Sequence, residues 1–131
     1  MKGRQRALVW YPSVDDVVDA NILSLDLSGN KHTPRLLGSR KGIETVLDEV
    51  KAAEGKGLSY QAALLMKRLV YRHFFNSGNH RTAYAVAKMF LRRNGRLLSV
   101  TGFGHAYGFI RGIDAKEIEE IQGWIEHGRN A

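Results

Sequence analysis

Apolar residues recur at the three- and four-residue spacing of an amphipathic α-helix over most of this 131-residue chain. Short clusters of glycine, asparagine and serine interrupt that spacing, and Asn76-Ser77-Gly78-Asn79 is the sharpest of them. Such clusters are typical of turns between helices. We therefore expect a single all-α domain over residues 1–131, a compact bundle of about five or six helices with short extended flap pieces. The helices are predicted at about residues 14–27, 43–54, 60–75, 80–93 and 114–125.

Polar residues at the expected helix starts support three of these helices. Ser13 precedes two aspartates and suits an N-cap, and Ser59 stands where the third helix should begin. Asp114 is expected to cap the last helix, and Glu117 would complete a capping box with it.

Three segments lack the helical period, and we expect them to be irregular or extended. Residues 28–42 are rich in Gly, Ser and Lys and include a proline, which favours a loop with a short extended flap. Residues 97–100 are apolar enough for a short strand. Residues 101–112 mix glycine with aromatic residues, which predicts irregular structure.

Charge is distributed unevenly along the chain, whose net charge is +7. All 13 acidic residues lie within 15–54 or 114–126, whereas residues 55–113 contain ten Lys or Arg and no acid. The middle segment should therefore carry a positive potential that attracts phosphates, nucleic acid or an acidic partner. A basic solvated surface, balanced by acidic helices folded against it, explains the same pattern equally well.

Two compositional absences exclude whole classes of function. The chain has no cysteine, which excludes a disulfide framework, a thiolate zinc site and a cysteine nucleophile. No apolar run approaches the ~18–20 residues of a membrane span. The apolar stretch at residues 7–11 is also shorter than the core of a signal peptide. We expect a cytoplasmic protein that does not enter the membrane.

The segment from His73 to Ala83 (HFFNSGNHRTA) places a tight polar loop between two predicted helices. Backbone N–H groups at a helix N-terminus bind anions, and Gly78 would let the backbone approach a ligand closely. Arg81 can grip phosphate oxygens, and His73 can take a proton from a hydroxyl. The segment thus predicts a phosphate site beside a general base. The alternative is a structural elbow, with His73 half-buried and Arg81 on the surface.

The order and spacing of these residues resemble the Fic/Doc signature, H-x-F-x-[DE]-[GA]-N-[GK]-R. Thr82-Ala83 is similar to the Doc branch, which often reads N-K-R-T-A, and residues 89–95 are similar to the end of its signature helix. The resemblance covers about residues 14–125. Five of the seven constrained positions match: His73, Phe75, Gly78, Asn79 and Arg81.

The resemblance implies an all-α transferase that moves a phosphate-containing group from ATP to a hydroxyl of a target protein. Most Fic members transfer AMP to Ser, Thr or Tyr, whereas Doc transfers the γ-phosphate to a Thr of elongation factor Tu. The target here would then be a protein with an acceptor hydroxyl, such as a translation factor. By position, His73 would be the catalytic base and Phe75 a core anchor. The nucleotide phosphates would be bound by Gly78, Asn79, His80 and Arg81.

Two departures from the signature leave the activity open. Ser77 occupies the position of the family acid that binds Mg²⁺, and a hydroxyl is a poorer ligand than a carboxylate. A carboxylate from the outer helices or the target, or the positive middle segment, would have to compensate; otherwise transfer is lost. His80 stands where the family has Gly for AMP transfer or Lys for phosphate transfer. A histidine is a pH-dependent substitute for lysine, so the transferred group stays open.

Many Fic proteins carry an inhibitory helix with the pattern [ST]-x-x-x-E-[GN]. The nearest match here is Thr45 to Glu49, but Val50 follows where Gly or Asn is required. Restraint would then come from a separate acidic antitoxin, which makes the chain the toxin of a toxin–antitoxin pair.

Two other functions remain open at this point. Ser77 is compatible with a pseudoenzyme that binds nucleotide or a partner without turnover. The net charge of +7 and the acid-free middle are compatible with a nucleic-acid-binding helical domain, although the arginines are spread over several elements.

Overall fold

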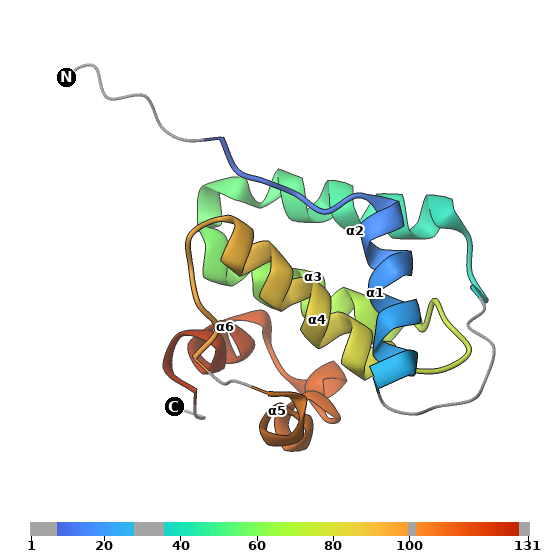
Figure 1. Cartoon of the computed structure of the whole chain (residues 1–131). Coiled ribbons are helices and arrows are strands. Elements are labelled where there is room, and N and C mark those ends of the chain that lie inside the picture. The colour runs from blue at the N-terminus through green and yellow to red at the C-terminus, as the bar shows by residue number, and fades with distance from the viewer. Residues whose placement is uncertain (1–7, 28–35, 100–101, 129–131) are drawn as a thin grey trace.

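The computed structural model describes residues 8–27, 36–99 and 102–128 (Figure 1). Within these ranges the chain forms six α-helices and two short 3₁₀ turns, and no strand longer than an isolated bridge is present. The predicted all-α bundle is confirmed. The elements are α1 (Val14–Leu27), α2 (Arg40–Ala52), η1 (Glu54–Lys56), α3 (Leu58–Arg72), α4 (Asn79–Arg93), α5 (Phe103–Ile110), η2 (Ile113–Ala115) and α6 (Ile118–His127).

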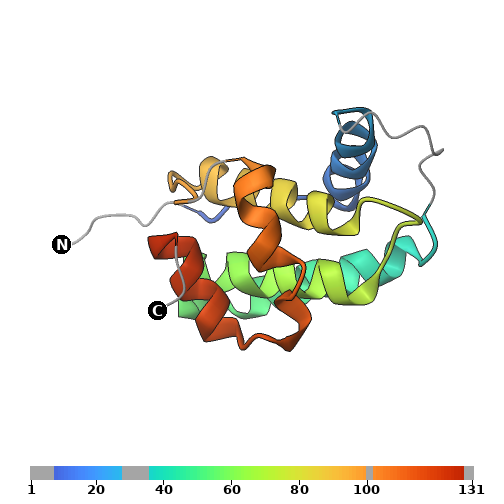
Figure 2. The ribbon, with the colours of Figure 1, turned by 90° about the horizontal axis from the view of Figure 1, so that it is seen from below.

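Helix α3 is the centre of the bundle, because α2, α4 and α6 all pack against it. Six consecutive residues of α3, 61–66, are buried, as expected of a helix surrounded on most sides. Helix α1 packs on α4 and α2, and α5 packs on α4 (Figure 2). The core includes Ile43, Leu65, Met66, Phe90, Leu91, Ile110, Ile121 and Ile125. Among the described residues, no helix has both the length and the apolar character that crossing a bilayer requires.

Serine caps begin the first two helices. The backbone N–H of Asp16 donates to Ser13 Oγ at 3.1 Å, and the Ser13 N–H donates to Asp16 Oδ2 at 2.8 Å, so the predicted cap is confirmed. The Oγ of Ser39 accepts from the Gly42 N–H at 2.9 Å. This second cap starts α2 at Arg40, inside the segment that the sequence predicts as a loop.

The other two predicted caps are wrong. The N-cap of α3 is Gly57. Ser59 lies buried in the first turn of the helix, so it does not occupy the N-cap position. Asp114 belongs to the 3₁₀ turn η2 and lies four residues before Ile118, where α6 begins, so it cannot be the N-cap of α6. Glu117 occupies the N-cap position of α6 and makes no side-chain capping bond, so the capping box does not form.

Residues 103–110 form helix α5, although the sequence predicts irregular structure there. Ala106, Phe109 and Ile110 are buried on one face, and their packing outweighs the cost of about 1 kcal/mol for each helical glycine. The predicted strand at 97–100 is absent from residues 97–99, which are irregular; Val100 lies outside the described residues. Ser99 instead bonds the end of α6, donating from its N–H to the Ile125 carbonyl at 3.3 Å.

Candidate functional site

The loop between α3 and α4 turns sharply at His73. This residue caps α3 in the left-handed conformation, with φ 51° and ψ 55°, and among the described non-glycine residues it alone has a positive φ. Such a conformation persists only where surrounding contacts impose it. The contacts come from residues 36–38, because the N–H groups of Leu37 and Gly38 both donate to the Phe74 carbonyl, at 2.7 and 3.2 Å.

The segment at residues 36–38 is the described part of the flap that the sequence predicts. Leu36 forms an antiparallel bridge with Phe75, which confirms an extended piece there; residues 28–35 of that loop lie outside the described residues. The buried Phe74 ring lies directly against the glycines that follow. A Cβ added to Gly42 would stand 2.8 Å from Phe74 Cε1, and one on Gly38 3.0 Å from Phe74 Cδ1. Glycine therefore allows the flap and the start of α2 to approach the loop.

Phe75 and Asn79 close the loop from inside. Phe75 is buried, and its backbone N–H donates to Asn79 Oδ1 at 3.0 Å. The Asn79 amide in turn donates to the Phe75 carbonyl at 2.8 Å. Both ends of the buried Asn79 side chain are thus used within the protein. What this residue can offer a phosphate is its backbone N–H.

The N-terminus of α4 has the character of an anion site. Gly78 is its N-cap in the left-handed conformation, with φ 76° and ψ 20°, and makes no side-chain capping bond. The first turn contains no acidic residue, and the N–H to carbonyl ladder begins with Thr82 donating to Gly78 at 2.8 Å. The amides of residues 79–81 precede that ladder. These N–H groups form the positive end of the helix dipole, where an anion is stabilised.

His80 is half-buried in the first turn of α4. Its ring meets Tyr107 of α5 edge-on, with centroids 6.2 Å apart. Burial lowers the pKa of His80, His73 lowers it further, and Asp114 acts in the opposite direction. At neutral pH His80 is therefore largely uncharged. It does not supply the constant positive charge that a lysine would provide at this position.

Arg81 is half-buried, and its guanidinium carbon lies 4.3 Å from the centroid of the Phe103 ring. His73 is exposed at the other side of the loop, where an incoming hydroxyl can reach it. The structure therefore places His73, Gly78, His80 and Arg81 around the start of α4.

Asn21 of α1 is a further residue of the site, and sequence reasoning assigned it no role. Its side-chain amide donates to the Ser77 carbonyl at 2.9 Å and to Thr82 Oγ1 at 3.0 Å. The side chain is 1% exposed, and its Oδ1 has no partner in the described part of the protein. An amide at a buried position of an apolar helix stripe is the signal that points to such a tether.

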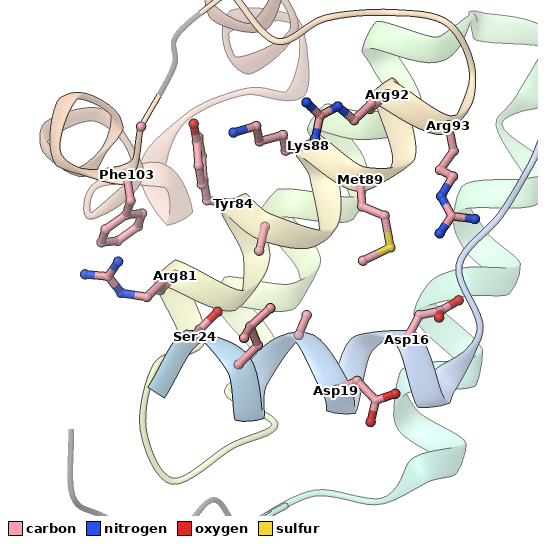
Figure 3. A pocket seen from close by; sticks show the side chains of 14 residues that line it. Asp16, Asp19, Ser24, Arg81, Tyr84, Lys88, Met89, Arg92, Arg93 and Phe103 are labelled. Atoms are coloured by element: carbon pink, nitrogen blue, oxygen red, sulfur yellow. The ribbon is translucent and has the colours of Figure 1, made fainter. Parts of the chain in front are cut away.

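A groove of about 730 Å³ lies between α1 and α4 and ends at Phe103 (Figure 3). Arg81, beside Phe103, occupies one end, whereas Asp16 lies toward the other. Arg81, Lys88, Arg92 and Arg93 make no ion pair with any described residue. The floor is mostly apolar. The residues that line it include Ala20, Leu23, Tyr84, Ala85 and Met89.

The described residues do not fit a magnesium site at Ser77. No three His, Asp or Glu side chains in the described ranges stand close enough together to hold a metal ion. Asp16 and Asp19 of α1 line the same groove as Arg81, but Asp16 already accepts the Ser13 N–H in the cap of α1. The site therefore rests on backbone amides and one guanidinium.

Residues 30–91 of the chain match the family model described as the Fic/DOC family. The match includes α2, α3, the loop that begins at His73 and most of α4. Among curated proteins, none matches the chain with significant similarity.

Proposed function

Because this chain belongs to the Fic/DOC family, we propose that it transfers AMP or a phosphoryl group from ATP to a Ser, Thr or Tyr hydroxyl of a target protein. The observation that carries the proposal is the anion site at the start of α4, with Arg81 on one side and the exposed His73 on the other. Neither the Doc-like branch nor a particular target follows from the family match. We propose that this reaction takes place in the cytoplasm, because it consumes ATP.

The proposed reaction uses three kinds of group. The amides of residues 79–81 and the Arg81 guanidinium bind the phosphates and stabilise the charge that develops on them. His73 accepts the proton of the target hydroxyl as its oxygen bonds to phosphorus. Attack on the α-phosphorus releases pyrophosphate, and attack on the γ-phosphorus releases ADP. In the family, a magnesium ion held by an acid assists this chemistry; Ser77 cannot replace that acid, and no step proposed here depends on the metal.

Labelled ATP separates the two reactions. The purified protein is incubated with cell extract, divalent metal and ATP labelled at either the α- or the γ-phosphate, beside a His73→Ala variant. Label from the α-phosphate alone on a protein band indicates AMP transfer, and label from the γ-phosphate alone indicates phosphorylation. Both signals should disappear in the variant, which keeps the anion site. Equal labelling by the variant would refute the role of His73.

Ser77 favours one alternative, a pseudoenzyme that binds nucleotide or a partner without turnover. ATP binding in the absence of any labelled protein, with the wild-type chain as much as with the variant, would support that alternative.

We also propose that the protein is the toxin of a toxin–antitoxin pair and that a separate acidic protein restrains it. Two observations support this partner. The nearest match to the family's inhibitory helix lacks its last required residue, because Val50 follows Glu49. The four groove cations have no ion-pair partner in the described part of the chain, so carboxylates of another protein can neutralise them.

A further inference from the structure

We propose that Phe103 of α5 is a positioning residue, which holds the Arg81 guanidinium in place to bind phosphate. The proposal rests on the proposed function, in which Arg81 binds the phosphates of the nucleotide. It assigns a role to α5, an element that lies outside the matched residues 30–91 and outside the loop that carries the family signature.

The contact between the two side chains is close and leaves the useful atoms open. The Arg81 guanidinium carbon lies 4.3 Å from the Phe103 ring centroid, within the range of a cation–π contact. The Arg81 guanidinium carbon lies over the ring, and the five N–H donors of a guanidinium lie in its own plane, so the ring does not have to occupy them. No described residue accepts a hydrogen bond from them or forms an ion pair with Arg81. The donors therefore remain available at the end of the groove, where Arg81 lies beside Phe103, and can bind phosphate oxygens (Figure 3).

The Phe103 ring itself contacts the rings of two tyrosines. Tyr84 of α4 meets it at 5.8 Å and 62°, and Tyr107, one turn later on α5, lies 5.4 Å from it. Tyr107 then contacts His80 edge-on. This row of rings joins one face of α5 to the first turn of α4, at the two side chains nearest the anion site. Because two neighbouring rings restrain the Phe103 ring, it can restrict the rotamers of a long arginine that makes no ion pair with a described residue.

Leucine and tyrosine substitutions at Phe103 test the contact, and Phe109 supplies a matched control. Phe109 is also on α5, but it stacks on Trp124 at 4.3 Å, away from Arg81. We expect Phe103→Leu, which keeps apolar volume but has no ring, to weaken ATP binding by about 3- to 10-fold in calorimetry. Phe103→Tyr should bind within about twofold of the wild type. Phe109→Leu should lower the melting temperature and leave ATP affinity within about twofold.

A second measurement follows the NMR signal of the Arg81 side chain in the absence of nucleotide. The ring current of Phe103 should shield the Arg81 Nε–Hε group, which gives a displaced NMR signal in the wild type. That signal should move toward the position of a free arginine in Phe103→Leu and stay in place in Phe103→Tyr and Phe109→Leu. An unchanged signal in Phe103→Leu would overturn the proposal, and so would equal losses of ATP affinity in the two leucine variants.

The two proposals can fail separately. If the wild type labels no protein from ATP, the transferase function is refuted, while the Arg81 signal still decides whether Phe103 holds the guanidinium. If labelling occurs but the Arg81 signal and the ATP affinity are the same in Phe103→Leu as in the wild type, the function stands and the positioning role is refuted.

Discussion

At the residue scale, the candidate site departs from the Fic/Doc signature at two positions, and the structure gives each a physical consequence. Ser77 offers a hydroxyl where the family has a carboxylate, and its backbone carbonyl is already tied to Asn21. His80 offers a ring whose pKa is lowered, chiefly by burial. Ser77 therefore lacks the negative charge that would bind a metal ion. His80 lacks the permanent positive charge with which a lysine would bind phosphate.

Restoring the acid at Ser77 should raise activity. We expect Ser77→Asp to increase Mg²⁺-dependent labelling of protein from ATP by about tenfold or more, because a carboxylate binds Mg²⁺ far better than a hydroxyl does. Ser77→Asn is the matched control, since it has the same shape without the charge. Similar labelling rates for the two variants would show that the missing carboxylate does not limit this site.

Replacing His80 by lysine should strengthen ATP binding in a pH-dependent manner. At pH 7.5 His80 is neutral, because burial and His73 lower its pKa and outweigh the influence of Asp114. A permanent cation there should tighten ATP binding by about 3- to 10-fold. The difference should shrink as the pH is lowered and the wild-type histidine begins to gain its own proton, which its lowered pKa delays below the usual range of a histidine. The control is His105→Lys, which adds the same charge at an exposed position of α5. An equal gain in ATP affinity in that variant would show that net charge alone explains the effect.

At the element scale, the site is held by contacts between segments far apart in the chain. The flap at residues 36–38 bonds the loop from one side, and Asn21 of α1 bonds it from the other. The loop keeps its strained His73 conformation between these two contacts. A loop positioned in this way can present backbone amides without needing a ligand to order it.

Removing the Asn21 tether should loosen the loop. Asn21→Leu removes the amide that donates to the half-buried Ser77 carbonyl and to Thr82 Oγ1, so we expect the free energy of unfolding to fall by about 1–3 kcal/mol. Urea denaturation measures this loss. Ile22→Ala, at the neighbouring exposed position, should change the stability by less than about 0.5 kcal/mol. A loss below that value in Asn21→Leu would mean that water replaces the tether.

The sequence was sufficient for the elements whose signals are local. Periodicity located α1 to α4 and α6, and Asn76 to Asn79 located the turn before the candidate site. It failed for α5, where glycine-rich propensity is overridden by the burial of Ala106, Phe109 and Ile110. It also could not indicate that both ends of the Asn79 amide bond Phe75, or that the Arg81 guanidinium lies over the Phe103 ring, because these contacts depend on how the chain packs.

At the scale of the whole molecule, the fold divides the positive charge into two parts. Arg40 and Arg68 pair with Asp15 and Glu49, as expected if acidic helices balance a basic surface. The groove cations of α4 have no such partner among the described residues, although two aspartates line the opposite wall. The groove therefore keeps a positive wall beside the anion site. That arrangement favours acidic ligands more than a uniformly solvated surface would.

A toxin that acts through this site should arrest growth in a manner that depends on His73. We expect induced expression of the wild-type chain to slow bacterial growth. An equal amount of the His73→Ala variant should have no effect, because this variant should still fold and bind phosphate but lacks the base that deprotonates the target hydroxyl. Immunoblots would confirm equal protein levels in the two cultures. Growth arrest by both proteins would trace the toxicity to the basic surface, whereas normal growth with abundant wild-type protein would argue against a toxin that needs an antitoxin to restrain it.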